Sequence, residues 1–187
     1  MLILKDNASF HTNVERAFND IDGNYKSYRG VVVVGTHNPR ELDDKLEKIR
    51  EAREKGIPFL GICFGMQLAL IEYARTVLGI KDATSEEISK GAYIIKKLPD
   101  LRVGIFKVEG EMESHWHHFA FNEKYKQDFE RDWSLSFTDG VLEIAMYRKH
   151  PFFILTQFHV EYKHKHKLIV DFLKVCKNFT KNANRNI

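Results

Sequence analysis

Two uninterrupted apolar runs, each followed by a helical pattern, constrain the fold of this chain more than any other feature of its sequence. Residues 30–35 read GVVVVG and residues 57–63 read IPFLGIC. Neither run alternates polar with apolar residues, which is typical of strands that are covered on both faces. Because strands that alternate with helices predict a parallel sheet between helical layers, we expect an α/β protein.

The first half of the chain supplies further elements of the same kind. Residues 1–6 read as a strand and residues 13–20 as a short helix. From about Arg40, apolar residues recur at helical spacing, and residues 65–79 predict a long helix. Since Cys63 ends the second apolar run, we expect it at a strand-to-helix turn.

From Ala92 onward the pattern changes to shorter alternating segments, which predict antiparallel or edge strands. The sequence TDG at residues 138–140 indicates a hairpin turn. A last helical pattern begins near Leu168, places Cys176 among its apolar residues, and ends in a polar tail that we expect to fray. The chain is long enough for one sizeable core, so we predict a single domain over residues 1–187.

Composition narrows the functional classes. The formal net charge is +3, which is too small to indicate a nucleic-acid-binding surface. The densest basic cluster, KHKHK at residues 163–167, is expected to be a solvated helix end, with phosphate binding as the alternative. No apolar segment approaches the roughly 20 residues that span a bilayer, and the N-terminal sequence lacks the features of a signal peptide. With only two cysteines, we expect a cytoplasmic protein without disulfides.

Cys63 lies between Gly61 and Gly65 in the segment GICFG. A residue on a sharp turn between strand and helix projects out of the sheet, and flanking glycines remove side chains that would clash there. The following helix would aim backbone N–H groups at the thiol, which favours the thiolate and stabilises an oxyanion. The segment therefore suits a nucleophile for acyl transfer. The alternative is an inert buried cysteine, which is the commoner state of this residue.

A cysteine nucleophile also needs a base that a third group orients. The segment FHVEY places His159 two residues before Glu161. In a strand both side chains would point to the same face, so that Glu161 could orient His159 and His159 could accept the thiol proton. Taken alone, the pair is equally consistent with a partly buried histidine and a surface carboxylate. A cysteine turn followed far downstream by this pair favours a catalytic triad.

Residues 58–87, PFLGICFGMQLALIEYARTVLGIKDATSEE, closely resemble the nucleophile region of class I glutamine amidotransferases, and most closely that of the CTP synthase glutaminase domain. The resemblance continues in LRVGIF, HWHHFAFNEKY and DGVLEIAMYRKHPFFILTQFHVEYK, and it is looser before Val31. It implies a flavodoxin-like α/β fold with a central, mostly parallel sheet, flanking helices and added antiparallel strands. It also implies hydrolysis of glutamine to glutamate and ammonia.

The resemblance assigns a role to each matching residue. Cys63 would form the γ-glutamyl thioester, His159 would be general base and acid, and Glu161 would orient His159. Phe64 and Thr36 would supply the N–H groups of the oxyanion hole. The other positions that match substrate-binding residues are Gly35, Gln67, Glu87 and His118.

Three positions depart from the family pattern. Thr36 stands where the family has a second glycine, His118 stands at the position of a carboxylate-binding arginine, and Val160 replaces a proline. The first two departures leave two alternatives to a glutamine hydrolase open. One is a catalytically silent homologue that binds a ligand or regulates a synthetase, and the other is a γ-glutamyl peptide hydrolase.

The histidines of HWHH also raise the question of a metal site. His115 and His117 would share a strand face, but no cysteine or acidic residue has the spacing of a closed zinc site, so we expect neither a metal nor another cofactor. The sequence contains no G-x-x-x-x-G-K-[ST] phosphate loop. We therefore expect a free-standing enzyme that acts on a small molecule and passes ammonia to a synthetase partner, without nucleic-acid or membrane partners. Homo-oligomer formation stays open.

Overall fold

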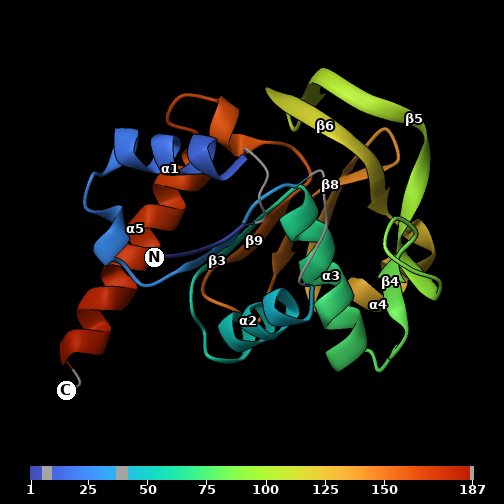
Figure 1. The fold of residues 1–187 in the computed structure, drawn as a ribbon, viewed down its shortest axis with the longest axis horizontal. Helices are drawn as coiled ribbons and strands as arrows, with labels where there is room; N and C mark the ends of the chain where they lie inside the picture. Colours follow the sequence, from blue (N-terminus) through green and yellow to red (C-terminus); the bar gives the residue numbers. More distant parts are fainter. Residues whose placement is uncertain (6–9, 37–41, 186–187) are drawn as a thin grey trace.

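A six-stranded sheet forms the centre of the computed structural model, which describes residues 1–5, 10–36 and 42–185 (Figure 1). Its strands are β1 (Leu2–Leu4), β2 (Val31–Val33), β3 (Phe59–Ile62), β7 (Trp133–Thr138), β8 (Val141–Tyr147) and β9 (Phe153–Thr156). They lie in the order β1-β2-β3-β9-β8-β7. The first three neighbouring pairs are parallel and the last two antiparallel. The predicted α/β architecture is therefore confirmed.

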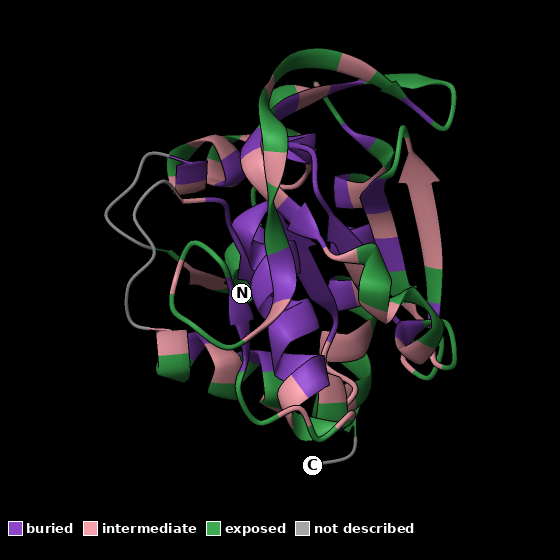
Figure 2. Cartoon of the chain, turned by 90° about the vertical axis from the view of Figure 1, so that its right-hand side faces the viewer, coloured by how far each residue is buried: buried purple, intermediate pink, exposed green. Residues whose placement is uncertain are grey.

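Helices cover both faces of this sheet. They are α1 (Phe10–Ile21), α2 (Leu42–Glu54), α3 (Phe64–Thr76) and α5 (Lys167–Arg185), with a short α4 at Lys126–Phe129. Because successive strand residues point to opposite faces, Val31 and Val33 pack with α2 and α3, whereas Val32 packs with α1 and α5. Figure 2 shows the resulting buried centre. Burial on both faces explains why the apolar run at residues 30–35 is unbroken.

A second, three-stranded sheet lies beside the first one. It is made of β4 (Ala83–Ser85), β5 (Ala92–Val108) and β6 (Glu111–Phe121). β5 and β6 form a long antiparallel hairpin, and the backbone amide of His159 donates to the carbonyl of Ser114 in β6 at 2.8 Å. This contact ties the hairpin to the end of β9 in the central sheet.

The TDG hairpin is confirmed. Asp139 and Gly140 connect β7 to β8, with φ angles of 51° and 73°. Two consecutive positive φ angles in a two-residue loop are the geometry of a type I′ turn, whose twist matches that of the strands.

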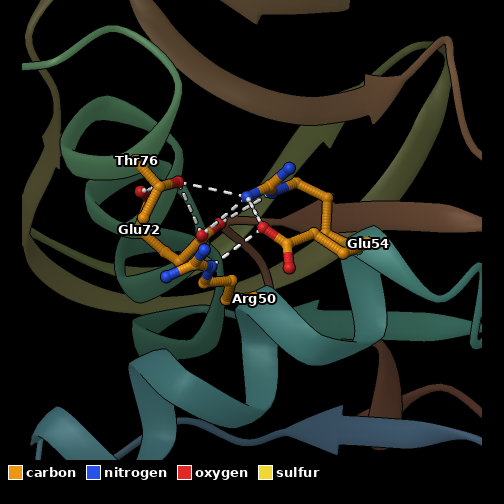
Figure 3. Close-up of polar contacts among 5 residues, drawn as sticks. Arg50, Glu54, Glu72 and Thr76 are labelled. Carbon is orange, nitrogen blue, oxygen red and sulfur yellow. Dashed lines mark hydrogen bonds and ion pairs between the residues drawn. The ribbon is translucent and has the colours of Figure 1, made fainter.

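A buried ion pair fixes α3 against α2. The Arg53 guanidinium donates to both carboxylate oxygens of Glu72 at 2.9 Å, and Glu72 is 2% exposed. Thr76 donates to Glu72 at 2.7 Å, and an exposed Arg50–Glu54 pair lies at the edge of the cluster (Figure 3). Since a bidentate arginine–carboxylate pair has directional hydrogen bonds, it restricts how α3 can shift along α2.

Two segments differ in part from their expected structure. The tail expected to fray continues α5 to Arg185, and Thr180 accepts a hydrogen bond from the Arg29 amide at 2.6 Å. The basic cluster at residues 163–167 is not simply a solvated helix end, because Lys163 and His166 both bind Glu113, at 3.3 and 3.2 Å. The expected helix start at Arg40 lies outside the described residues. Over the described ranges, no helix is long and apolar enough to cross a membrane.

Candidate active site

Cys63 occupies a strained turn between β3 and α3. Its backbone has φ 53° and ψ −106°, a combination that residues with a β-carbon avoid at a cost of about 1–3 kcal/mol. Its amide donates to the carbonyl of Thr156 at 2.7 Å, which ties the turn to the end of β9. Cys63 therefore lies at the strand-to-helix turn that the sequence predicts.

The flanking glycines are required by close backbone approaches. A β-carbon on Gly65 would lie 2.1 Å from the carbonyl oxygen of Val33, and one on Gly61 would lie 2.8 Å from a methyl group of Leu155. The first contact involves main-chain atoms that cannot rotate away. Gly65 therefore allows the first turn of α3 to sit directly against β2, and Gly61 allows the main chain of Gly65 to approach β3.

His159 and Glu161 form a buried pair beside this turn. Nδ1 of His159 lies 2.8 Å from a carboxylate oxygen of Glu161, and the two side chains are 2% and 0% exposed. The other ring nitrogen, Nε2, is buried and makes no hydrogen bond. Burial opposes the charged imidazolium, but the charge of Cys63 and the contacts with Cys63 and Glu161 raise the pKa of His159 to about 10. The imidazolium form of His159 is therefore favoured at neutral pH.

The pair does not have the strand geometry expected for it. β9 ends at Thr156, and Val160–Tyr162 form a 3-10 turn after His159. The amide of His159 pairs with Ser114 of the second sheet, so the chain leaves the central sheet before it reaches His159. The contact between His159 and Glu161 is therefore made across this turn and not along one face of a strand.

Three neighbours confine the His159 ring. The Phe10 ring stacks on it with centroids 4.8 Å apart, and Tyr162 meets it edge-on at 5.7 Å. A β-carbon on Gly35 would lie 3.0 Å from Cε1 of His159 and 3.4 Å from Cβ of Cys63. The Gly35 backbone therefore packs against both members of the pair, and the ring has little freedom to turn away from Cys63.

A pocket of about 130 Å³ opens onto Cys63. Six of the predicted residues line it, namely Thr36, Cys63, Phe64, Gln67, Glu87 and His118, together with Leu101, Trp116, His117 and Phe119. The predicted residues Gly35, His159 and Glu161 are not among its lining, but Gly35 and His159 both contact Cys63. Residues far apart in the sequence thus meet at one site.

The polar groups of the pocket are mostly acceptors. Gln67 donates its amide to the carbonyl of Phe119 at 3.0 Å, which leaves its buried Oε1 without a partner. Partial burial raises the pKa of Glu87. Nε2 of His118 is buried and has no hydrogen-bond partner.

Thr36 does not have the positive φ that a β-branched residue resists. Its backbone conformation is therefore compatible with threonine.

A buried polar cluster adjoins the pocket through His117, and of its members the sequence analysis singled out the two histidines but not Arg102 or Glu143. Arg102 of β5 pairs with Glu143 of β8 at 2.8 Å, and His115 contacts His117 at 3.2 Å. Burial raises the pKa of Glu143 to about 7 and lowers those of His115 and His117 to about 3 and 4. Over the described residues, no group of three or more His, Cys, Asp or Glu is arranged to hold a metal ion. One signal was available, because Glu143 interrupts the apolar positions of an alternating strand.

Cys176 has a different environment from Cys63. It is fully buried in α5, and burial raises its pKa to about 12. A thiol of this kind stays protonated and unreactive at neutral pH. The expectation that Cys176 is a core residue agrees with this position.

The chain matches a known protein family over most of its length. The family described as Glutamine amidotransferase class-I matches residues 5–175. CTP synthase of Bdellovibrio bacteriovorus is 36% identical over 184 residues, which cover 78% of this chain and 34% of that protein. CTP synthase of Campylobacter jejuni is 32% identical over 201 residues, which cover 84% of this chain and 37% of that protein. The chain therefore spans about a third of the length of these relatives.

A solved structure shows the same fold. It is the glutaminase domain of Trypanosoma brucei CTPS with bound acivicin, which superposes with a TM-score of 0.80 at 20% sequence identity. The superposition covers 95% of this chain and 92% of that chain. Almost the whole of this chain is therefore accounted for by that one fold.

Proposed function

This chain belongs to the class I glutamine amidotransferases, and on that premise we propose that it hydrolyses the γ-amide of glutamine through a thioester on Cys63. One observation carries the proposal. The buried His159–Glu161 pair contacts Cys63 on its strained turn, and the same cysteine lines the pocket. This arrangement supports a nucleophile, a base and an orienting carboxylate in those roles.

The first step transfers the γ-glutamyl group to sulfur. The Cys63 thiolate attacks the γ-carboxamide carbon, and the carbonyl oxygen takes up the negative charge. Phe64 begins α3, so its N–H points toward the helix N-terminus, and together with the N–H of Thr36 it stabilises this oxyanion. The His159 imidazolium then gives its Nε2 proton to the amide nitrogen, the C–N bond breaks, and ammonia leaves.

The second step releases glutamate. Neutral His159 takes a proton from water as the water oxygen attacks the thioester carbon. Collapse of the intermediate breaks the C–S bond and returns the thiolate beside the imidazolium. Throughout both steps, the Glu161 carboxylate accepts the hydrogen bond from Nδ1–H at 2.8 Å and so keeps Nε2 facing the sulfur.

The pocket supports recognition of an ammonium group more strongly than of a carboxylate. The free acceptor of Gln67 and the carboxylate of Glu87 suit the α-ammonium of a glutamyl group. Of the described residues that line the pocket, none is a lysine or arginine, so His118 is left to bind the α-carboxylate. This lining favours weak binding of free glutamine. It also favours a second candidate, hydrolysis of γ-glutamyl peptides, whose leaving group offers binding contacts besides the α-carboxylate.

The ammonia acceptor is part of the same proposal. The matched relatives are CTP synthases, and this chain spans about a third of their length. We therefore propose that ammonia passes to a synthetase partner. No nucleic-acid or membrane partner is part of this function, and a cytoplasmic location fits a reduced, reactive Cys63.

Release of glutamate and ammonia tests the proposal. The purified chain is incubated with glutamine and with a series of γ-glutamyl amides and peptides, and Cys63→Ser is the matched control. We expect release of glutamate that depends on Cys63. A folded protein that releases neither product from any of these substrates, alone or with a synthetase partner, would support the catalytically silent alternative.

A further inference from the structure

Gln157 is a buried polar residue that directly contacts the sulfur of Cys63. It follows β9 and is 1% exposed. Its side-chain Nε2 donates to Sγ of Cys63 at 3.7 Å. A buried amide costs free energy unless it is hydrogen-bonded, so a core position usually carries an apolar residue. We propose that Gln157 is a further catalytic residue, whose amide N–H holds and stabilises the Cys63 thiolate.

The backbone holds Gln157 in place for this role. Its main-chain N–H donates to the carbonyl of Glu143 in β8 at 2.9 Å. The preceding residue, Thr156, accepts the amide hydrogen of Cys63 at 2.7 Å. The chain from Thr156 to His159 therefore contacts the nucleophile three times, once at its main-chain amide and twice at its side chain.

The surroundings of the sulfur explain why a donor is needed. The thiol of Cys63 donates to the carbonyl oxygen of Trp116 at 3.9 Å. Once the proton has moved to Nε2 of His159, the sulfur is negative and this carbonyl oxygen becomes an unfavourable neighbour. The amide of Gln157 carries a partial positive charge on its N–H and no formal charge. It therefore stabilises the thiolate and does not compete with His159 for the proton.

The same contact acts twice in the proposed reaction. The thiolate is present before it attacks the carboxamide carbon, and it forms again when the C–S bond of the thioester breaks. A donor at Sγ assists the second event because a better-stabilised thiolate is a better leaving group. This inference rests on the proposed role of Cys63 as nucleophile.

The pH dependence of thiol alkylation tests the inference without any substrate. In a Cys176→Ser background, Cys63 is the single thiol, and its reaction with iodoacetamide is followed by intact mass between pH 4 and pH 10. Gln157→Leu removes the donor, and Gln157→Glu keeps the size but places a carboxylate at the sulfur. Gln127, exposed on α4, gives the matched control Gln127→Leu.

We expect both Gln157 variants to move the midpoint of the alkylation profile upward, by roughly 0.5–1 pH unit for Gln157→Leu and by more for Gln157→Glu. Below the midpoint, the rate falls about three- to tenfold, since a tenfold change corresponds to one pH unit. Gln127→Leu leaves the profile unchanged. With an active substrate, Gln157→Leu lowers kcat and leaves KM unchanged.

Unchanged profiles in both Gln157 variants would overturn the inference. If Gln157→Leu does not fold, as judged by thermal unfolding, the near-isosteric Gln157→Glu variant decides alone. A purely structural role would lower the unfolding temperature and leave the alkylation midpoint in place. Because alkylation requires no glutamine, a shifted midpoint in a protein without glutaminase activity would support the role of Gln157 and count only against the proposed function.

Discussion

Replacing Gly65 by alanine gives the sharpest test of how the cysteine turn is built. Gly65 is the second residue of α3, and glycine within a helix is about 1 kcal/mol less favourable than alanine. Helix propensity alone therefore predicts that Gly65→Ala stabilises the protein. The packing predicts the opposite, because the new β-carbon would lie 2.1 Å from the carbonyl oxygen of Val33 and 2.7 Å from its carbonyl carbon.

The size of the effect follows from these distances. A nonbonded carbon and oxygen cannot approach within 3 Å without strain, so the start of α3 must move away from β2 by about an ångström. Overpacking of this kind costs about 1–3 kcal/mol, with the upper end expected where main-chain atoms collide. After the gain of about 1 kcal/mol from helix propensity, the net loss is about 2 kcal/mol, which lowers Tm by roughly 4–8 °C for a chain of this size.

Urea unfolding and thermal unfolding measure this loss. Gly23→Ala is the matched control, because its nearest atom would lie 3.7 Å from the new β-carbon, an ordinary contact. We expect Gly65→Ala to lower the free energy of unfolding by about 2 kcal/mol and Gly23→Ala to change it by less than about 0.5 kcal/mol. Gly65→Ala should also slow alkylation of Cys63, since the turn moves with α3. A Gly65→Ala protein as stable as the parent would refute the packing argument.

Three further predictions concern the site and its support. Glu161→Gln should lower kcat for glutamine hydrolysis by about 10²–10⁴-fold with little change in Tm, because it removes the carboxylate that orients and charges His159; an unchanged kcat would remove Glu161 from the mechanism. The pKa of His117 is lowered from 6.5 to about 4 chiefly by burial, so its contribution to stability is present above pH 6.5 and is lost as the pH falls toward 4. Urea unfolding at pH 7 and pH 5 should show a pH-dependent loss about 2 kcal/mol smaller in His117→Gln than in the parent; equal losses would contradict this account. Glu72→Ala should cost about 3 kcal/mol in urea unfolding because it removes both short hydrogen bonds to the buried Arg53 guanidinium and leaves it only the longer ion pair with Glu54 at 3.5 Å, whereas Arg50→Ala, which breaks an exposed pair, should have a much smaller effect. Equal effects of the two changes would show that the buried pair is not a special support of α3.

The central sheet could be predicted because its signals are local. Residues 30–35 and 57–63 are apolar without alternation, and in a chain with intervening helices such runs rarely form anything other than buried parallel strands. The turn at Cys63 was equally accessible, since Gly61 and Gly65 mark the close approaches that the structure contains. Strand β4 was missed because Ala83–Ser85 is three residues long and carries no periodic pattern.

The parts that could not be predicted depend on contacts between distant residues. The turn after His159 is set by its hydrogen bond to Ser114, which is a tertiary contact with no local pattern. The Arg102–Glu143 pair joins strands of two different sheets. Periodicity predicts which residues face inward but not which inward residues meet. The members of the pocket at Cys63 were therefore proposed from the family resemblance and not from spacing.

In the proposed function, Cys63 is a nucleophile in a pocket that recognises a glutamyl group. The most direct test of this role is the intact mass of the protein after exposure to an electrophilic glutamine analogue, with Cys63→Ser as control and free glutamine as competitor. We expect a single adduct that is absent from Cys63→Ser and suppressed by glutamine. A protein that forms no adduct, while Cys63 still reacts with iodoacetamide, would contradict it, because the thiol would then be reactive in a pocket that does not bind glutamine.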